Sequence, residues 1–387
     1  MNILHVIPYF TPMRGGDVNV CYNLSKYLAR RGNLVTIITT DFEFDQKYSL
    51  SIERENVKVI PFKCVINAGL YLVSPSMKNW LNSNINSFDI IHLHDFRTYQ
   101  NQITSFYAQK FNIPYVVQAH GDLPHANIKV PLKKIYDYIY GTNILKKSAQ
   151  LLALSNKESV DYNFLSSGSE IEIIPNGIDQ QKFKYLPSRG QFRKKLSIED
   201  SERIILYLGR IHKTKGIDLL IQSFTSVKER FCDVKLVIVG PDDGHLNILK
   251  TQIAEARIIK DVIFTGPLFD TLKLEVLVDS DIFVTPMFYG FPVTFLEALA
   301  CGIPIITTFA VDRLEDLEDN LYVVPYNRED LSNAIVYLLN NDKYRHEIGL
   351  KGKDFVNVHY TWLGIATKLE QLYMSVCMRS FTYNKMP

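Results

Sequence analysis

The residues best suited to chemistry in this sequence lie in the stretch 281–308, on a strand, a loop and a helix. The apolar run 282–284 predicts a buried strand, and a helix is expected after the loop that contains Gly290 and Pro292. Free backbone N–H groups at the start of that helix, together with the helix dipole, favour an anion such as a diphosphate. A second buried strand at 303–308 completes the strand, helix, strand unit of a parallel sheet.

Glu297 lies about one turn into this otherwise apolar helix. An unpaired carboxylate is costly to bury, so Glu297 should reach solvent or accept strong hydrogen bonds, each worth roughly 1.5 to 3 kcal/mol. The two hydroxyl groups of a ribose are donors at a suitable separation. Alternatively, Glu297 is simply the solvated position of an amphipathic helix.

A second candidate is the loop 209–216, which reads GRIHKTKG and joins a buried strand to an apolar helix. It places Arg210 and Lys215 beside a helix N-terminus, where positive charge opposes the helix dipole. A bound pyrophosphate would compensate for that charge. Alternatively, both side chains are solvated surface cations.

In the first half of the chain, His120 directly follows an apolar strand and should emerge at the carboxyl edge of a sheet, where open α/β sheets bind ligands. A helix-capping or loop-bracing role is the alternative. Gly15 and Gly16 turn the chain into a first helix, for which Asp17 is a plausible cap. His92 and His94 share one face of a strand, and because no third ligand is visible nearby, we expect an ordinary strand end there, with His94 at the rim of the ligand cleft, and no metal.

Length and composition limit the possible classes of protein. A chain of 387 residues with 47% hydrophobic residues suggests two domains, and a net charge of +2 argues against bulk electrostatic binding to nucleic acid. Five scattered cysteines indicate a reducing compartment and no structural metal. Neither a secretory signal nor a membrane-spanning run is visible, so we expect a cytoplasmic protein.

Two series of apolar strands separated by helical stretches predict two doubly wound α/β domains with parallel sheets, joined by the polar segment that follows the turn cluster 175–179. The segment 129–147 combines lysines with tyrosines and isoleucines. It could lie on an anionic membrane surface. We favour the alternative, an amphipathic helix that covers the sheet and keeps its lysines in water.

The run Gly290-Phe291-Pro292, followed by LEALACGIP at 296–304, resembles the donor-binding motif of retaining glycosyltransferases of family 4, which have the GT-B fold. Further matches around residues 15, 120, 176 and 210–215 extend the resemblance over nearly the whole chain. In that family the motif usually has two glutamates. Glu297 matches the second, but Tyr289 stands at the first position, and a phenol carries no negative charge at neutral pH.

The resemblance implies a GT-B fold of two facing doubly wound Rossmann-like domains with an interdomain cleft. Residues 1–179 would form the acceptor-side domain and 180–359 the nucleotide-sugar domain, with a last helix at about 360–379 packing back on the first. It also implies catalytic and substrate-binding residues. The catalytic set is His120, Arg210 and Lys215, and the substrate-binding set is Gly15, Gly16, Asn176, Gly290, Phe291, Pro292, Val293, Thr294 and Glu297.

The activity implied is retaining, metal-independent transfer of a hexose from a nucleoside diphosphate sugar to a glycan or lipid-linked acceptor. The nucleoside diphosphate sugar is a co-substrate, and no cofactor is expected. Such an enzyme would act in cell-surface polysaccharide or glycoconjugate synthesis, in the cytoplasm or at the inner face of the cell membrane. Three alternatives stay open at this point. They are a nucleotide-sugar epimerase of the same fold, a non-catalytic or partner-dependent subunit, for which Tyr289 is the best argument, and a membrane-binding module.

Overall fold

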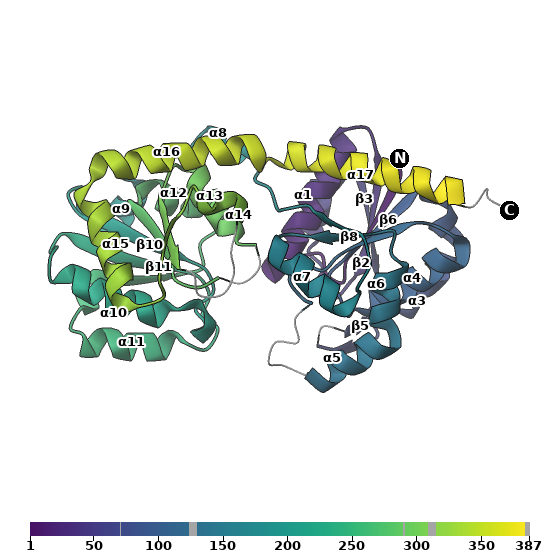
Figure 1. The fold of residues 1–387 in the computed structure, drawn as a ribbon, viewed down its shortest axis with the longest axis horizontal. Coiled ribbons are helices and arrows are strands. Elements are labelled where there is room, and N and C mark those ends of the chain that lie inside the picture. The colour runs from purple at the N-terminus through teal and green to yellow at the C-terminus, as the bar shows by residue number, and fades with distance from the viewer. Residues whose placement is uncertain (70, 124–129, 289–290, 309–314, 384–387) are drawn as a thin grey trace. The chain divides into compact units, whose positions relative to one another are not determined.

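The computed structural model describes residues 1–387 except 70, 124–129, 289–290, 309–314 and 384–387 (Figure 1). The chain forms two compact units, Met1–Gly177 with Trp362–Pro387, and Ile178–Thr361. The division precedes the expected boundary by two residues, because Ile178 and Gln180 bond to the end of the second unit: the Ile178 N–H donates to the Tyr360 carbonyl at 2.7 Å and Gln180 Nε2 to the Asn357 carbonyl at 2.8 Å.

The first unit is built on a seven-stranded parallel sheet with the order β3-β2-β1-β6-β7-β8-β9. Its strands are β1 (Asn2–Val6), β2 (Leu34–Thr40), β3 (Val57–Phe62), β6 (Ile90–His94), β7 (Tyr115–Gln118), β8 (Gln150–Ala153) and β9 (Ile171–Ile173), and β4 (Ile66–Ala68) and β5 (Tyr71–Val73) form a separate antiparallel pair. Its helices are α1 (Gly16–Arg30), α2 (Gln46–Glu53), α3 (Pro75–Asn84), α4 (Tyr99–Phe111), α5 (Val130–Tyr136), α6 (Thr142–Lys147), α7 (Asn156–Leu165) and α17 (Trp362–Tyr383), with short turns η1 (Pro12–Arg14), η2 (Ile85–Ser87) and the π-helical η3 (Asp137–Gly141).

The second unit has a six-stranded parallel sheet with the order β12-β11-β10-β13-β14-β15. Its strands are β10 (Arg203–Leu208), β11 (Val234–Val239), β12 (Val262–Gly266), β13 (Ile282–Thr285), β14 (Ile305–Thr308) and β15 (Tyr322–Val324). Its helices are α8 (Gln180–Lys184), α9 (Gln191–Leu196), α10 (Ile217–Lys228), α11 (Leu246–Glu255), α12 (Asp270–Asp279), α13 (Val293–Ala300), α14 (Glu315–Glu318), α15 (Arg328–Asn340) and α16 (Asp342–His359), with short turns η4 (Lys213–Lys215) and η5 (Ile259–Asp261).

Each sheet is covered by apolar side chains on both faces, which is why its inner strands read as continuous apolar runs. Helix α17 belongs to this core in the first unit. Its buried positions repeat at helical spacing and join the layer that contains α1: Trp362, Ile365, Leu369, Tyr373 and Val376. The strand order reverses direction between β1 and β6 in the first unit and between β10 and β13 in the second, and such switch points are where open α/β sheets bind ligands.

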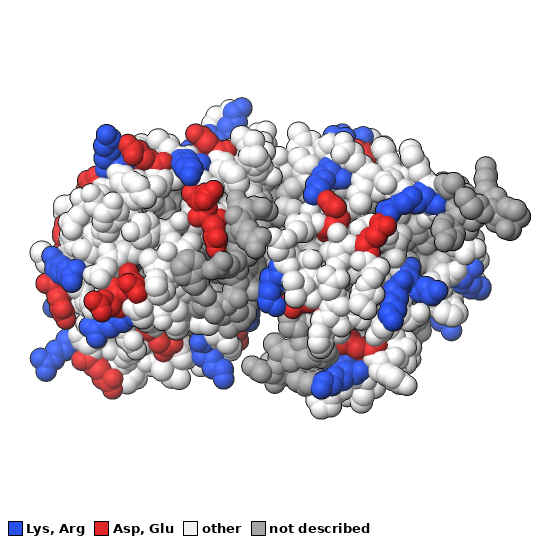
Figure 2. Space-filling model, in the orientation of Figure 1, with Lys and Arg blue, Asp and Glu red and all other residues white. Residues whose placement is uncertain are grey.

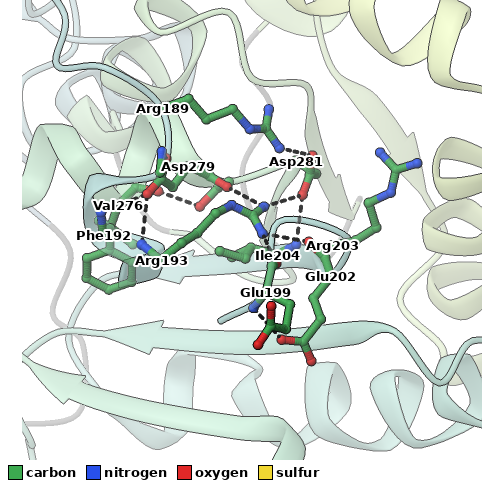
Figure 3. A network of polar contacts seen from close by, with 12 residues as sticks. Arg189, Phe192, Arg193, Glu199, Glu202, Arg203, Ile204, Val276, Asp279 and Asp281 are labelled. Atoms are coloured by element: carbon green, nitrogen blue, oxygen red, sulfur yellow. Dashed lines mark hydrogen bonds and ion pairs between the residues drawn. The ribbon is translucent and has the colours of Figure 1, made fainter. Parts of the chain in front are cut away.

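A buried polar network lies where β10 and β13 begin, at the opposite edge of the second sheet from the switch-point loops (Figure 3). Arg193 of α9 is fully buried and donates to the carbonyls of Glu199, Glu202 and Asp279 at 2.7–3.0 Å, and to the Asp281 carboxylate at 3.2 Å. The Asp279 carboxylate in turn accepts from the N–H groups of Phe192 and Arg193 at the start of α9. The network therefore fixes α9 to the strand ends and serves the fold.

Candidate active site

The loops that follow β10 and β13 meet at the switch point of the second unit. Gly216 has φ +69, and a Cβ there would lie 3.0 Å from Cβ of Pro286 and 3.1 Å from Cγ of Met287. Only glycine fits both this backbone conformation and this close approach. The cationic loop and the segment that leads to α13 are thus brought together.

The loop after β11 supports the cationic loop from its other side. A Cβ on Gly240 would lie 1.9 Å from the carbonyl oxygen of Gly209, so these two backbones touch. The Ile211 N–H donates to the Pro241 carbonyl at 2.9 Å, and the Ile211 carbonyl accepts from the Asp243 N–H at 3.0 Å. Three loops from adjacent strands therefore form one braced edge.

Arg210 extends from this edge into solvent, with 63% of its side chain exposed, and its Nη1 lies 2.7 Å from Oδ2 of Asp243. The Asp243 carboxylate thus partly compensates the positive charge of Arg210, which opposes the helix dipole. The sequence did not indicate this ion pair. Exposed pairs of this kind contribute only about 0–1 kcal/mol, so an incoming anion can displace Asp243 at small cost. Lys215 ends the η4 turn and is partly buried.

Helix α13 begins with Pro292 in the N-cap position and receives no hydrogen bond from a capping side chain. By helix geometry, the first N–H groups, those of Val293 and Thr294, have no acceptor within the helix. Phe291 packs on Tyr360 with ring centroids 5.8 Å apart, so it is partly a core residue. Tyr289 and Gly290 lie outside the described residues.

Glu297 is bound by a residue that the sequence did not point to. Both oxygens of its carboxylate lie 2.6 Å from Nζ of Lys273 on α12, and its side chain is 17% exposed. Of the two environments expected, strong hydrogen bonding is the one found. The carboxylate is therefore held in a fixed position beside the start of α13.

In the first unit, the residues after β6 and β7 adopt unusual backbone conformations. Asp95, Arg97 and His120 have φ of 62, 59 and 54, and left-handed conformations of this kind cost side-chain-bearing residues roughly 1–2 kcal/mol each. Buried Arg97 joins the segments that follow β6 and β7: it binds the Asp137 carboxylate through two nitrogens at 2.8 and 2.9 Å and the Asp122 and Leu123 carbonyls. Such strain concentrates at functional sites.

The sequence suggests Asp17 as the cap of α1, but the structure does not place it there. Gly15 occupies the N-cap position with φ +118, which requires glycine, and no side chain caps the helix. Asp17 is instead hydrogen bonded to Asp95, and burial raises the pKa of both carboxyls. A Cβ on Gly16 would meet no atom within 4 Å, so packing does not require glycine there.

His120 is half-buried and forms the outer member of a chain of three histidines, of which His94 and His5 are fully buried. Its Nε2 lies 2.9 Å from Nδ1 of His94, and Nε2 of His94 lies 2.7 Å from Nδ1 of His5 on β1. Burial lowers the pKa of His120 and His5 to about 3, which keeps both rings neutral. His94 is fully buried and therefore not at a cleft rim, and the structure brings it close to His5 and Cys21, neighbours that the sequence did not reveal.

Asn176 is buried just before the division between the units, and its Oδ1 has no hydrogen-bond partner among the described residues. The site residues expected from the sequence thus fall into two groups. Arg210, Lys215, 291–294 and Glu297 lie at the carboxyl edge of the second sheet, and Gly15, Gly16, His120 and Asn176 belong to the first unit.

Two family models together match most of the chain. The model described as Glycosyltransferase Family 4 matches residues 14–182, and the model described as Glycosyl transferases group 1 matches residues 188–355. The chain belongs to the family 4 glycosyltransferases. The second match covers the loops of β10, β11 and β13 described above, and the first covers the histidine chain from its outer member to His94.

Relatives of this glycosyltransferase span nearly its whole length. An uncharacterised glycosyltransferase of Methanocaldococcus jannaschii is 25% identical over 93% of this chain and 94% of its own. One subunit of the human phosphatidylinositol N-acetylglucosaminyltransferase is 24% identical over 98% of this chain and 77% of its own. The phosphatidyl-myo-inositol mannosyltransferase of Mycobacterium tuberculosis is 23% identical over 97% of each chain.

Solved structures share the fold of this glycosyltransferase. HepE of Anabaena, in complex with UDP and glucose, is 17% identical and superposes with a TM-score of 0.78 over 97% of this chain and 100% of its own. Sucrose-phosphate synthase of Thermosynechococcus elongatus is 19% identical, with a TM-score of 0.73 over 97% of this chain and 98% of its own. The expected GT-B fold of two Rossmann-like units is confirmed.

Proposed function

We propose that this glycosyltransferase moves a sugar from a nucleoside diphosphate sugar to a glycan or lipid-linked acceptor, with retention at the anomeric carbon and without a metal. The observation that carries the proposal is the contact of three loops at one switch point, which gathers Arg210, Lys215 and the uncapped start of α13 near the fixed carboxylate of Glu297. HepE, which shares the fold, is solved with UDP and glucose, in line with a nucleotide-sugar donor.

In the proposed reaction, Arg210 and Lys215 stabilise the negative charge that grows on the departing diphosphate, assisted by the N–H groups of Val293 and Thr294. Preorganised donors of this kind are usually the largest catalytic contribution, and two cations supply charge that a metal would otherwise supply. Glu297 accepts hydrogen bonds from the ribose hydroxyls, and His120 orients the sugar.

The bond between the anomeric carbon and the diphosphate oxygen breaks as the acceptor oxygen attacks from the same face. The acceptor proton passes to an oxygen of the leaving phosphate, so the atoms balance without a carboxylate nucleophile. Two of the relatives named above carry phosphatidylinositol in their names, in line with a lipid-linked acceptor and a role in glycoconjugate synthesis.

The proposal is tested by thermal unfolding with a panel of nucleoside diphosphate sugars. One donor at 100 times its Kd should stabilise the protein by about 2.7 kcal/mol. Alanine at Glu297 should weaken nucleotide binding by about 1.5 to 3 kcal/mol, because it removes hydrogen bonds to a charged acceptor, and should leave inorganic pyrophosphate binding unchanged. Glu275→Ala, which removes a carboxylate from α12 that pairs with Lys195, is the matched control.

The outcomes separate the candidate functions. Turnover of donor only when acceptor is present supports transfer, whereas interconversion of donor sugars without acceptor would identify an epimerase. Nucleotide binding that gives turnover only after a companion chain is added would favour the partner-dependent subunit. The human relative is itself one subunit of an enzyme, which is the reason to test this alternative. If no nucleotide sugar shifts the unfolding temperature, the donor assignment is wrong.

We further propose that the segment from α5 to η3 contacts a membrane surface. Only part of it covers the sheet: Ile144 and Leu145 of α6 are buried and Tyr136 is partly buried against the same core, but several apolar side chains before α6 are exposed. Their exposed fractions are 62% for Leu132, 54% for Ile135, 90% for Tyr138 and 54% for Ile139. None of the helices within the described residues is long and apolar enough to span a bilayer, so the contact would be peripheral.

Apolar insertion should contribute more to this contact than charge. Figure 2 shows positive and negative side chains interspersed over the visible face of each unit. Serine at Leu132, Ile135 and Ile139 together should reduce co-sedimentation with phosphatidylglycerol vesicles at least tenfold, because each buried side chain contributes about 1.5–3 kcal/mol. Glutamate at Lys133 and Lys134 should cost about 1 kcal/mol for each lysine, in a salt-dependent way.

The matched control is serine at Phe164 and Val160, two exposed apolar residues of α7. Vesicle binding that falls equally in this control, or that survives the triple change on α5 and η3, would show that this segment is not the membrane contact.

A further inference from the structure

Three histidines form a hydrogen-bonded row across the sheet of the first unit. His5 lies on β1, His94 on β6 and His120 directly after β7, and these strands are neighbours in the sheet. Their rings are nearly parallel, with interplanar angles of 22° for His5 and His94 and 5° for His94 and His120. The row runs from the core to the carboxyl edge, where His120 adopts its left-handed backbone conformation.

The two hydrogen bonds of the row couple the protonation of all three rings. Each neutral imidazole carries one proton, and each of the two N···N contacts needs one proton between its atoms. Only two arrangements satisfy both contacts. In one, every proton points toward His120, whose Nδ1 then carries an N–H; in the other, every proton points toward His5, and Nδ1 of His120 is a bare acceptor.

The inner end of the row favours the first arrangement. Nε2 of His5 is buried and has no hydrogen-bond partner among the described residues. The second arrangement would place an N–H there, in the core, where solvent and ligands do not reach it. The first places its N–H on Nδ1 of His120, at the carboxyl edge of the sheet, where a substrate can supply the missing acceptor.

We propose that His94 is a positioning residue that holds His120 as the neutral tautomer with its proton on Nδ1, and that this N–H is a hydrogen-bond donor to an oxygen of the transferred sugar. This role rests on the proposed function. Nδ1 of His120 is itself enclosed and has no partner among the described residues, so it is a donor without an acceptor until a substrate supplies one. Hydrogen-bond partners that orient metal-ligating histidines are worth on the order of 10- to 100-fold in metal affinity or activity, and we expect an effect of similar size here.

The experiment measures the tautomer and the transfer rate separately. The full chain is labelled with 15N histidine, its nine histidines are resolved by nitrogen chemical shift, and His120 is assigned by the signal lost in His120→Asn. We expect His120 to show the Nδ1–H tautomer alone. His94→Leu, which removes both hydrogen bonds, should give exchange between the two tautomers and a loss of kcat on the order of 10- to 100-fold.

His94→Asn places an amide where Nδ1 was, so it can still donate to His120 and should restore the single tautomer and most of the rate. The matched control is His92→Leu: His92 is equally buried on the same strand and stacks on His94 at 4.1 Å, but it bonds to the Tyr373 hydroxyl at 2.6 Å. It should leave the His120 tautomer unchanged.

A wild-type His120 with its proton on Nε2, or in both tautomers, would overturn the inference even if no variant folds. A tautomer that is fixed by His94, combined with a transfer rate unaffected by His94→Leu, would overturn the donor role of His120. Donor binding and turnover in the wild type, measured independently, show whether the proposed function itself stands.

Discussion

Alanine in place of Lys215 is expected to lower kcat for sugar transfer by about 10²- to 10³-fold, the usual effect of losing one preorganised group that stabilises developing negative charge. Lys215 lies on the η4 turn, partly buried, between β10 and α10. Because Gly216 packs against Pro286 and Met287, this turn has a fixed position relative to the segment that leads to α13. The loss should appear in kcat more than in KM, since the charge on the diphosphate is greatest in the transition state.

The matched control is Lys213→Ala, which removes an exposed lysine from the same η4 turn and should change kcat by no more than about twofold. Arg210→Ala should cost less than Lys215→Ala, because Arg210 is more exposed and already shares its charge with Asp243. If Lys213→Ala and Lys215→Ala have equal effects, the turn acts through net charge and not through a positioned ammonium group.

Much of the fold was predictable because strands buried on both faces read as continuous apolar runs. The runs at 204–208 and 282–284 proved to be strands, and the run at 303–308 contains the strand Ile305–Thr308, which starts two residues later than expected. The loops that follow β10 and β13 carry the motif residues. The order of strands in the sheet, however, is a property of long-range pairing. It brings β10 beside β13 and β1 beside β6, and it decides which loops meet.

The residues that sequence reasoning missed are those whose partners are distant in the chain. Lys273 on α12 meets Glu297 on α13 only in the folded unit, and nothing in the spacing of the two residues indicates a pair. His5 joins His94 across 89 positions. The left-handed conformation of Asp95 and His120 gave no signal either, since neither is a glycine.

The segment 129–147 shows the limit of an amphipathic pattern. Its periodicity fits either a helix that covers the sheet or a helix that lies on a membrane surface. The sequence could not show which residues of the segment serve which role. In the structure, Gly141 closes a π-helical turn, after which Ile144 and Leu145 are buried. Leu132 and Ile135 before that turn, and Tyr138 and Ile139 within it, are exposed. Exposure depends on which neighbouring elements are present, and a single segment does not encode them.

The largest stability effect is expected from Arg193→Ala, which should lower the free energy of unfolding of the second unit by about 3–5 kcal/mol. The substitution removes hydrogen bonds to the Glu199, Glu202 and Asp279 carbonyls and leaves the buried Asp281 carboxylate with less compensation. Because the network lies at the opposite edge of the sheet from the candidate site, nucleotide affinity of the folded protein should be unchanged. Far-UV circular dichroism in urea measures the loss.

The matched control is Arg189→Ala. Arg189 also pairs with Asp281, at 2.7 Å, but its side chain is 56% exposed, so its removal should cost only about 0–1 kcal/mol. Both tryptophans, Trp80 and Trp362, belong to the first unit. Where the units unfold independently, tryptophan fluorescence should therefore keep its midpoint in Arg193→Ala while the dichroism midpoint falls. A dichroism midpoint equal to that of Arg189→Ala would mean that the buried guanidinium contributes no more than a surface pair.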